Sequence, residues 1–159
     1  MSFDPRTLGQ SVYKELMSQR KLYEDALQAN PALSQEDCKK HLQEQKSQAV
    51  ELYTYLSTWG LMRLRAEEKS LNKWKPHEKP TILAKAVKSQ EGKREIIQSF
   101  FRCLEDVSGE TNLANDIGIA TLQTVNVDDY LGLTGLGLAL AQEFSFWASA
   151  VYWDIKGGN

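Results

Sequence analysis

The amino-acid sequence predicts an all-α protein, a compact bundle of five to six helices with one long central helix. Apolar residues recur at spacings of three and four along nearly the whole chain, and no segment alternates as a half-buried strand does. At 159 residues the chain has the length of one domain. Its 42% hydrophobic and 25% charged residues are typical of a folded globular protein. We therefore expect a single helical domain over residues 1–159.

The first helix is expected from Arg6 to Ala29. It ends there because a residue that precedes proline, here Asn30 before Pro31, is disfavoured in the helical conformation. The apolar positions that form its buried stripe are Leu8, Val12, Leu16, Tyr23 and Leu27.

A second and much longer helix is predicted from Gln35 to about Leu71, with the hydroxyl group of Ser34 capping its first turn. Its length would be on the order of 55 Å at 1.5 Å per residue, which is more than a compact domain of this size needs. The far end is therefore expected to project or to line a groove. The basic residues at that end are Arg63, Arg65 and Lys69. The helix's apolar stripe consists of Cys38, Leu42, Gln45, Ala49, Leu52, Leu56 and Trp59.

Residues 72–80 are expected to form an exposed basic loop that two prolines, Pro76 and Pro80, bracket. Two further helices follow in residues 81–90 and 91–107, and Ser108-Gly109 supplies a stop signal after the second. Residues 108–126 are expected to be an irregular connection, with a short helix as the open alternative for its ambiguous part from 110 onward.

The last helix is expected to begin after Asn126, whose side chain suits an N-cap. Its first half contains Gly132, Gly135 and Gly137, each of which costs about 1 kcal/mol relative to alanine in an exposed helix. We expect a second helix to approach closely there and offset this cost. A phosphate-binding loop is disfavoured, because these glycines follow no strand and lack the lysine of such loops.

The segment from Tyr130 to Trp153 is long enough to span a bilayer, but Glu143 lies near its middle. A carboxylate at that depth costs roughly 2.5–3.5 kcal/mol or more, so we interpret the segment as a buried core helix. The N-terminus has no basic head before an apolar run, which predicts a cytoplasmic protein without a signal peptide. Cys38 and Cys103 are expected to be buried, reduced thiols.

The positive charge of the chain is concentrated between Arg63 and Arg94. These thirty-two residues hold ten of the nineteen Lys and Arg residues and only four acidic ones, a formal charge of +6. The other 127 residues sum to −8, so the net charge of −2 conceals a strongly basic segment. Such a segment favours a polyanionic partner.

Trp74 lies inside this basic segment, between Lys73 and Lys75. A tryptophan between lysines can stack on an unpaired base while its neighbours contact phosphates, as in proteins that bind single strands without sequence preference. The alternative is a solvated loop whose tryptophan packs back on the core and whose lysines serve solubility.

The sequence contains no recognisable catalytic centre. Cys38 and His41 share a helix face and could combine with His77 and Cys103, but their spacing matches no familiar zinc pattern. No serine lies in Gly-x-Ser-x-Gly, and no Glu-x-x-His tetrad is present for a bundle di-metal site. We expect a protein that is not an enzyme and needs no cofactor or metal.

Two segments resemble a known family. The central helix reads Leu-Tyr-Thr-Tyr-Leu-Ser-Thr-Trp-Gly-Leu at residues 52–61, and the last helix runs from Tyr130-x-x-x-Thr134 into Phe146-Trp147-Ala148-x-x-Val151. In these segments the chain is similar to the small subunit of type III CRISPR effector complexes. It differs from that family after Thr134, where charged residues are expected and glycines occur instead.

The resemblance implies a non-catalytic helical subunit that stacks with copies of itself, contacts neighbouring effector subunits and lines the channel for guide and target RNA. The basic segment would then hold RNA phosphates and give affinity without sequence preference. The residues expected to bind RNA are Arg63, Arg65, Lys69, Lys73, Trp74, Lys75, Lys85 and Lys88.

Two functions without nucleic acid stay open beside this one. The first is a helical protein-binding adaptor, in which the long second helix and the C-terminal Trp147 and Trp153 form a groove or a homodimer seam. The second is a small regulator of an enzyme partner.

Overall fold

The computed structural model describes residues 5–29, 35–70 and 91–156. The predicted cap at Ser34, the predicted loop 72–80 and the predicted helix 81–90 lie outside these residues. The described part is all-helical and contains no strand, which confirms the predicted fold class. Its helices are α1 (Pro5–Ala29), α2 (Gln35–Trp59), α3 (Leu61–Ser70), α4 (Glu91–Ser108), α5 (Gly118–Thr124) and α6 (Val127–Val151).

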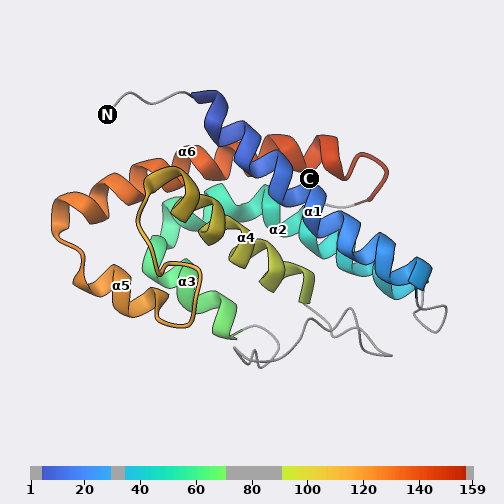
Figure 1. Cartoon of the computed structure of the whole chain (residues 1–159), viewed down its shortest axis with the longest axis horizontal. Coiled ribbons are helices and arrows are strands. Elements are labelled where there is room, and N and C mark those ends of the chain that lie inside the picture. The colour runs from blue at the N-terminus through green and yellow to red at the C-terminus, as the bar shows by residue number, and fades with distance from the viewer. Residues whose placement is uncertain (1–4, 30–34, 71–90, 157–159) are drawn as a thin grey trace.

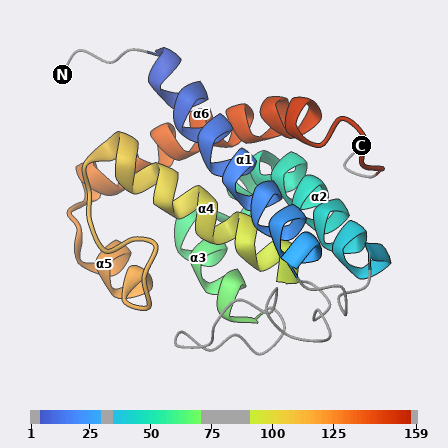
Figure 2. The same ribbon diagram turned by 45° about the vertical axis from the view of Figure 1, so that its right-hand side comes forward.

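Four helices form the body of the bundle. The helices α1, α2, α4 and α6 each contact the other three, while the shorter α3 packs against α2, α4 and α5. Figures 1 and 2 show α3 and α5 together at one end of the bundle, beside the first half of α6. The last helix thus contributes to both parts, because its first half lies at the α5 end and its second half lies between α1 and α2.

The long helix predicted from Gln35 to about Leu71 is wrong, because the chain bends at Gly60 between α2 and α3 (Figure 1). Gly60 has φ of +87°, a conformation that glycine adopts without the steric cost that a side chain would bring. The bend turns Leu61 and Leu64 into the core, where both are fully buried. A straight helix would instead have carried these leucines away from the bundle.

The predicted cap of the last helix is confirmed. The side chain of Asn126 accepts a hydrogen bond of 2.8 Å from the backbone N–H of Asp129. The expected close approach occurs at only one of the three glycines. A Cβ on Gly137 would lie 3.3–3.4 Å from Leu56, Leu61 and Phe100, which belong to α2, α3 and α4.

The close approach predicted at Gly132 and Gly135 is wrong, because a Cβ on either glycine would meet nothing within 4 Å. Both glycines lie on the exposed face of α6. Since the stripe of buried residues is narrow, one glycine in three falls on it, and the other two face away from the bundle.

The connection after α4 is partly ordered by side-chain hydrogen bonds. The helix ends at Ser108, and Gly109 follows with φ of +78°, as the stop signal predicts. One carboxylate oxygen of Glu105 accepts hydrogen bonds from the backbone N–H groups of Leu113 and Ala114, at 2.8 and 2.7 Å. The short helix α5 follows, so the open alternative of a helix in this connection is the one observed.

The cysteines are buried and unpaired, as expected. Burial raises the pKa of the Cys38 thiol, and it raises the pKa of Cys103 to about 12. Such thiols stay protonated at neutral pH and are therefore unreactive. Among the described helices, none is both long and apolar enough to cross a membrane.

A buried polar network joins four segments of the bundle. Tyr23 on α1 donates a hydrogen bond of 2.7 Å to Glu95 Oε1 on α4, and Gln45 Nε2 on α2 donates to the same oxygen at 3.2 Å. Tyr152, directly after α6, donates to Gln45 Oε1 at 2.6 Å. All four side chains are buried, so the network fixes the register of the helices as well as satisfying its own polar atoms.

Burial raises the pKa of Glu95 to about 7, although the hydrogen bonds from Tyr23 and Gln45 and the charge of Arg94 act to lower it. Glu44 is a further negative charge nearby and acts in the same direction as burial. The ordinary pKa of 4.5 applies in the unfolded chain. The folded protein therefore binds a proton at Glu95 more tightly than the unfolded chain does.

We predict that folding stability falls as pH rises from 4.5 to 7, because ionised Glu95 is disfavoured in the folded state only. The contribution from this group is roughly 3 kcal/mol, from 1.36 kcal/mol per pKa unit. Urea unfolding at several pH values should show a smaller decline for Glu95→Gln, which keeps the acceptor oxygen. Parallel curves for the two proteins would contradict the assignment.

A second prediction contrasts two glycines. A Cβ on Gly92 would overlap the backbone oxygen of His41 and lie 2.8 Å from Cβ of Glu44, so α4 would have to move away from α2. Gly92→Ala should therefore destabilise the protein by about 1–3 kcal/mol. The matched change Gly135→Ala adds a methyl group in open space and should stabilise the protein by about 0.5–1 kcal/mol. Thermal unfolding measures both, and equal effects would show that the helices do not approach as described.

Candidate nucleic-acid interface

The structure separates the residues that the sequence predicts to bind RNA. Arg63 and Arg65 lie on α3, the first exposed and the second buried. Lys69 is also on α3, but its side chain lies outside the described residues. The same is true of the remaining members of the set, which are Lys73, Trp74, Lys75, Lys85 and Lys88.

The prediction that Arg65 binds RNA is wrong, because its guanidinium group is used inside the protein. The side chain is 1% exposed. Its nitrogens donate to the backbone oxygens of Leu113, Ala114 and Asn115 at 2.8, 3.1 and 2.5 Å. It also forms an ion pair with Glu68, which is fully buried. Arg65 therefore ties α3 to the connection before α5 and offers no donor to an external phosphate.

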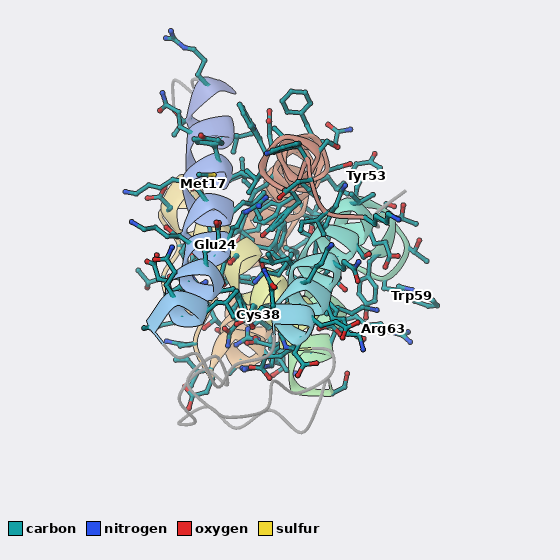
Figure 3. The ribbon with its side chains drawn as sticks, turned by 90° about the vertical axis from the view of Figure 1, so that its right-hand side faces the viewer. Met17, Glu24, Cys38, Tyr53, Trp59 and Arg63 are labelled. Carbon is teal, nitrogen blue, oxygen red and sulfur yellow. The ribbon has the colours of Figure 1, made fainter. Side chains whose placement is uncertain are left out.

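Arg63 lies two residues earlier and faces away from the bundle. Successive residues on a helix are separated by about 100°, so residues 63 and 65 point to nearly opposite sides. The guanidinium carbon of Arg63 lies 3.9 Å from the ring centre of Trp59, at the end of α2. Figure 3 shows both side chains projecting from the same edge of the molecule, on the opposite side from Met17 and Glu24 of α1. The indole of Trp59 is 50% exposed.

The bend at Gly60 between α2 and α3, called the elbow below, sets the relative position of Trp59 and Arg63. The backbone N–H of Gly60 donates to the oxygen of Leu56 at 2.9 Å, and the oxygen of Gly60 accepts from the N–H of Leu64 at 3.1 Å, so Gly60 belongs to the last turn of α2 and the first turn of α3. Across the bend, the hydroxyl group of Tyr55 donates to Glu67 Oε2 at 3.0 Å. Burial, followed by this hydrogen bond, raises the pKa of Tyr55, so the phenol stays a donor at neutral pH. Trp59 and Arg63 are thus carried on two helices with a fixed mutual orientation.

Arg63 also differs from other arginines in its surroundings. Several described arginines are held by carboxylates, which neutralise their charge. In contrast, no carboxylate of the described chain lies within ion-pair distance of Arg63, whose guanidinium lies over the ring of Trp59 and close enough to the Tyr55 hydroxyl to act against the rise of its pKa. The paired arginines and their partners are Arg20 with Asp154 and Glu24, Arg65 with Glu68, Arg94 with Glu91, and Arg102 with Glu15.

Trp59 was not expected to belong to an interface. Its place at the end of the apolar stripe predicts burial, whereas the structure leaves it half exposed beside the bend at Gly60. The available signal was the spacing of four residues between Trp59 and Arg63, which on the continuous helix that the sequence predicts would place a cation beside an aromatic ring.

The net negative charge of the chain is concentrated in its last third. From Cys103 to Ile155 there is no Lys, Arg or His, and eight carboxylates give a formal charge of −8. Asp154 is bound by Arg20 and Glu105 by backbone N–H groups, whereas Asp128 and Asp129 are exposed at the start of α6. This acidic part of the chain would repel a polyanion.

Two further features of the described surface are the arrangement of its titratable side chains and a groove. Within residues 5–29, 35–70 and 91–156, no three His, Cys, Asp or Glu side chains are arranged to hold a metal ion. A groove of about 470 Å³ lies between α1 and α6 and is lined mainly by Tyr13, Glu143 and Trp147. The rings of Tyr13 and Trp147 are 5.1 Å apart, and Trp147 Nε1 donates to Glu143 at 3.1 Å.

Comparison of the chain with protein-family models, with curated proteins and with solved structures finds no match.

We predict opposite consequences for the two neighbouring arginines of α3. Arg65→Ala should destabilise the protein by about 3–5 kcal/mol, because it leaves the buried carboxylate of Glu68 without its counter-charge. Arg63→Ala should change the free energy of unfolding by no more than about 0.5 kcal/mol, since the side chain is exposed. Urea unfolding of both variants measures the difference. Similar stability losses would show that Arg63 is structural as well.

Proposed function

We propose that this protein is a non-catalytic RNA-binding subunit of a cytoplasmic ribonucleoprotein, and that its α3 side contacts the RNA backbone. The observation that carries the proposal is the exposed, carboxylate-free guanidinium of Arg63 at the first position of the +6 segment. Clustered positive charge of this kind binds phosphates without reading sequence.

The distribution of charge along the chain supports the basic segment as the part that meets RNA. Beyond the basic segment from Arg63 to Arg94, the fifty-three residues from Cys103 to Ile155 carry eight carboxylates and no cation. A polyanion is attracted to the first segment and repelled by the second. Asp128 and Asp129, exposed on α6, are in turn suited to a basic surface of a neighbouring subunit.

The particular assembly that we propose is a type III CRISPR effector complex, in which this chain acts as the small subunit. The proposal comes from the sequence resemblance in the central and last helices, and an all-helical bundle is compatible with it. In that role the chain contacts guide or target RNA, other effector subunits and copies of itself. Lys69, Lys73, Lys75, Lys85 and Lys88, with Trp74, would extend the contact that Arg63 begins.

The proposal is tested by gentle, low-salt purification of the tagged protein from the organism that makes it. We expect repeat-derived guide RNA and RNA-guided effector subunits to co-purify. Lys73→Glu/Lys75→Glu should reduce the RNA that the subunit cross-links to under ultraviolet light, because two phosphate-binding charges are reversed.

The matched control is Lys39→Glu/Lys40→Glu, which makes the same charge change at exposed positions of α2. It should leave RNA cross-linking unchanged. Equal losses in both variants would indicate a general charge effect rather than an interface. Recovery of the protein without RNA would contradict the proposed function.

One observation favours a protein-binding adaptor as a second candidate. Tyr13 and Phe146 are exposed on either side of Trp147, with ring centres 5.1 Å from it in both cases, and together they form an aromatic surface over α1 and α6. Exposed aromatic clusters are typical of protein interfaces. A partner recovered without RNA, and lost in Phe146→Ala, would favour this function.

A further inference from the structure

We infer that Trp59 and Arg63 form a stacking site for one unpaired base of single-stranded RNA. The inference rests on the proposed RNA-binding function and adds a contact to the base itself, beyond the phosphates. Neither residue was expected to bind a base from the sequence, where Trp74 was the candidate.

The exposure of Trp59 is the first observation behind this inference. Half of a large indole remains in water at the end of α2 (Figure 3). Trp147, by comparison, is partly covered by Tyr13, and its Nε1 donates to Glu143. The half of the indole that remains exposed is available to stack on a flat ligand, and every nucleobase presents a flat face.

The guanidinium of Arg63 supplies the second observation. It lies 3.9 Å from the indole centre, within cation–π distance, so the two planar groups form one composite surface with a positive charge. Bases stack on indole rings and on guanidinium planes alike, and the charge attracts the phosphate that follows the base. Exposed Trp153 provides a contrast, because within the described chain no cation lies over its ring.

The elbow makes this surface rigid before the ligand arrives. Trp59 and Arg63 lie on either side of Gly60, whose φ of +87° sets the angle between their helices. The hydrogen bond from Tyr55 to Glu67 connects α2 and α3 across the same bend. Since the angle between the two helices is set before binding, the backbone of the site need not be ordered by the ligand, which favours a contact between small groups.

The geometry also selects the form of the nucleic acid. In an A-form duplex every base is stacked on its neighbours, and its faces cannot be reached by a protein side chain. A surface that binds a base face therefore requires an unpaired nucleotide. The site would accept any of the four bases, since stacking uses no hydrogen bonds to base edges.

The test compares two labelled RNAs of about eight nucleotides, one a normal single strand and one an abasic ribose-phosphate chain of equal length. Fluorescence anisotropy at low salt measures their affinity for the full-length protein. Trp59→Ala should weaken binding of the normal strand roughly fivefold or more and leave the abasic strand unchanged. Trp153→Ala is the matched control and should change neither affinity.

A second variant, Arg63→Lys, keeps the charge and removes the planar group. It should also weaken binding of the normal strand more than binding of the abasic strand. It keeps the test valid if Trp59→Ala fails to fold, which thermal unfolding reports separately. Equal binding of both strands by the wild-type protein, with no effect of Trp59→Ala, would overturn the stacking site and leave phosphate binding intact. Failure of the wild-type protein to bind either strand would overturn both proposals.

Discussion

The carboxyl group of Glu95 is the point on which the rest of the structure depends. It accepts hydrogen bonds from α1 and α2 while sitting on α4, and through Gln45 it is connected to the end of α6. An apolar core tolerates small slips of one helix along another, but a buried hydrogen-bond network does not, because a slip would leave polar atoms unpaired. The close crossing of α2 and α4 at Gly92 brings Gln45 and Glu95 within reach of each other.

The position of α3 follows from this body through a second buried polar contact. Leu61 and Leu64 anchor α3 to the core, and Arg65 binds the backbone oxygens before α5. Since Arg65 and Arg63 point to nearly opposite sides of the helix, the contact that buries one guanidinium presents the other to solvent. The exposure of Arg63 at the candidate interface therefore follows from the contact between Arg65 and the connection before α5.

Charge is segregated along the chain, and two exposed aromatic surfaces lie on different helices. The Trp59–Arg63 surface is on α2 and α3, where the basic segment begins, and the aromatic surface around Trp147 is on α1 and α6. A subunit of a ribonucleoprotein needs one surface for nucleic acid and another for its protein neighbours. The two candidate surfaces can be occupied at the same time, because they lie on different helices.

The sequence by itself determined the helical class, most helix ends and the segregation of charge. These are local properties: the spacing of apolar residues, the caps at Asn126 and Gly109, and the order of charged residues along the chain. Tertiary structure alone decided which polar residues are internal. Arg65 and Glu68 look like exposed helix residues, and Trp59 looks like a core residue, until the turn at Gly60 reverses their surroundings. One backbone angle at a glycine redirects α3, and no pattern of apolar spacing encodes that direction, since a straight and a bent helix have the same spacing of apolar residues in sequence and differ in which side chains are turned into the core.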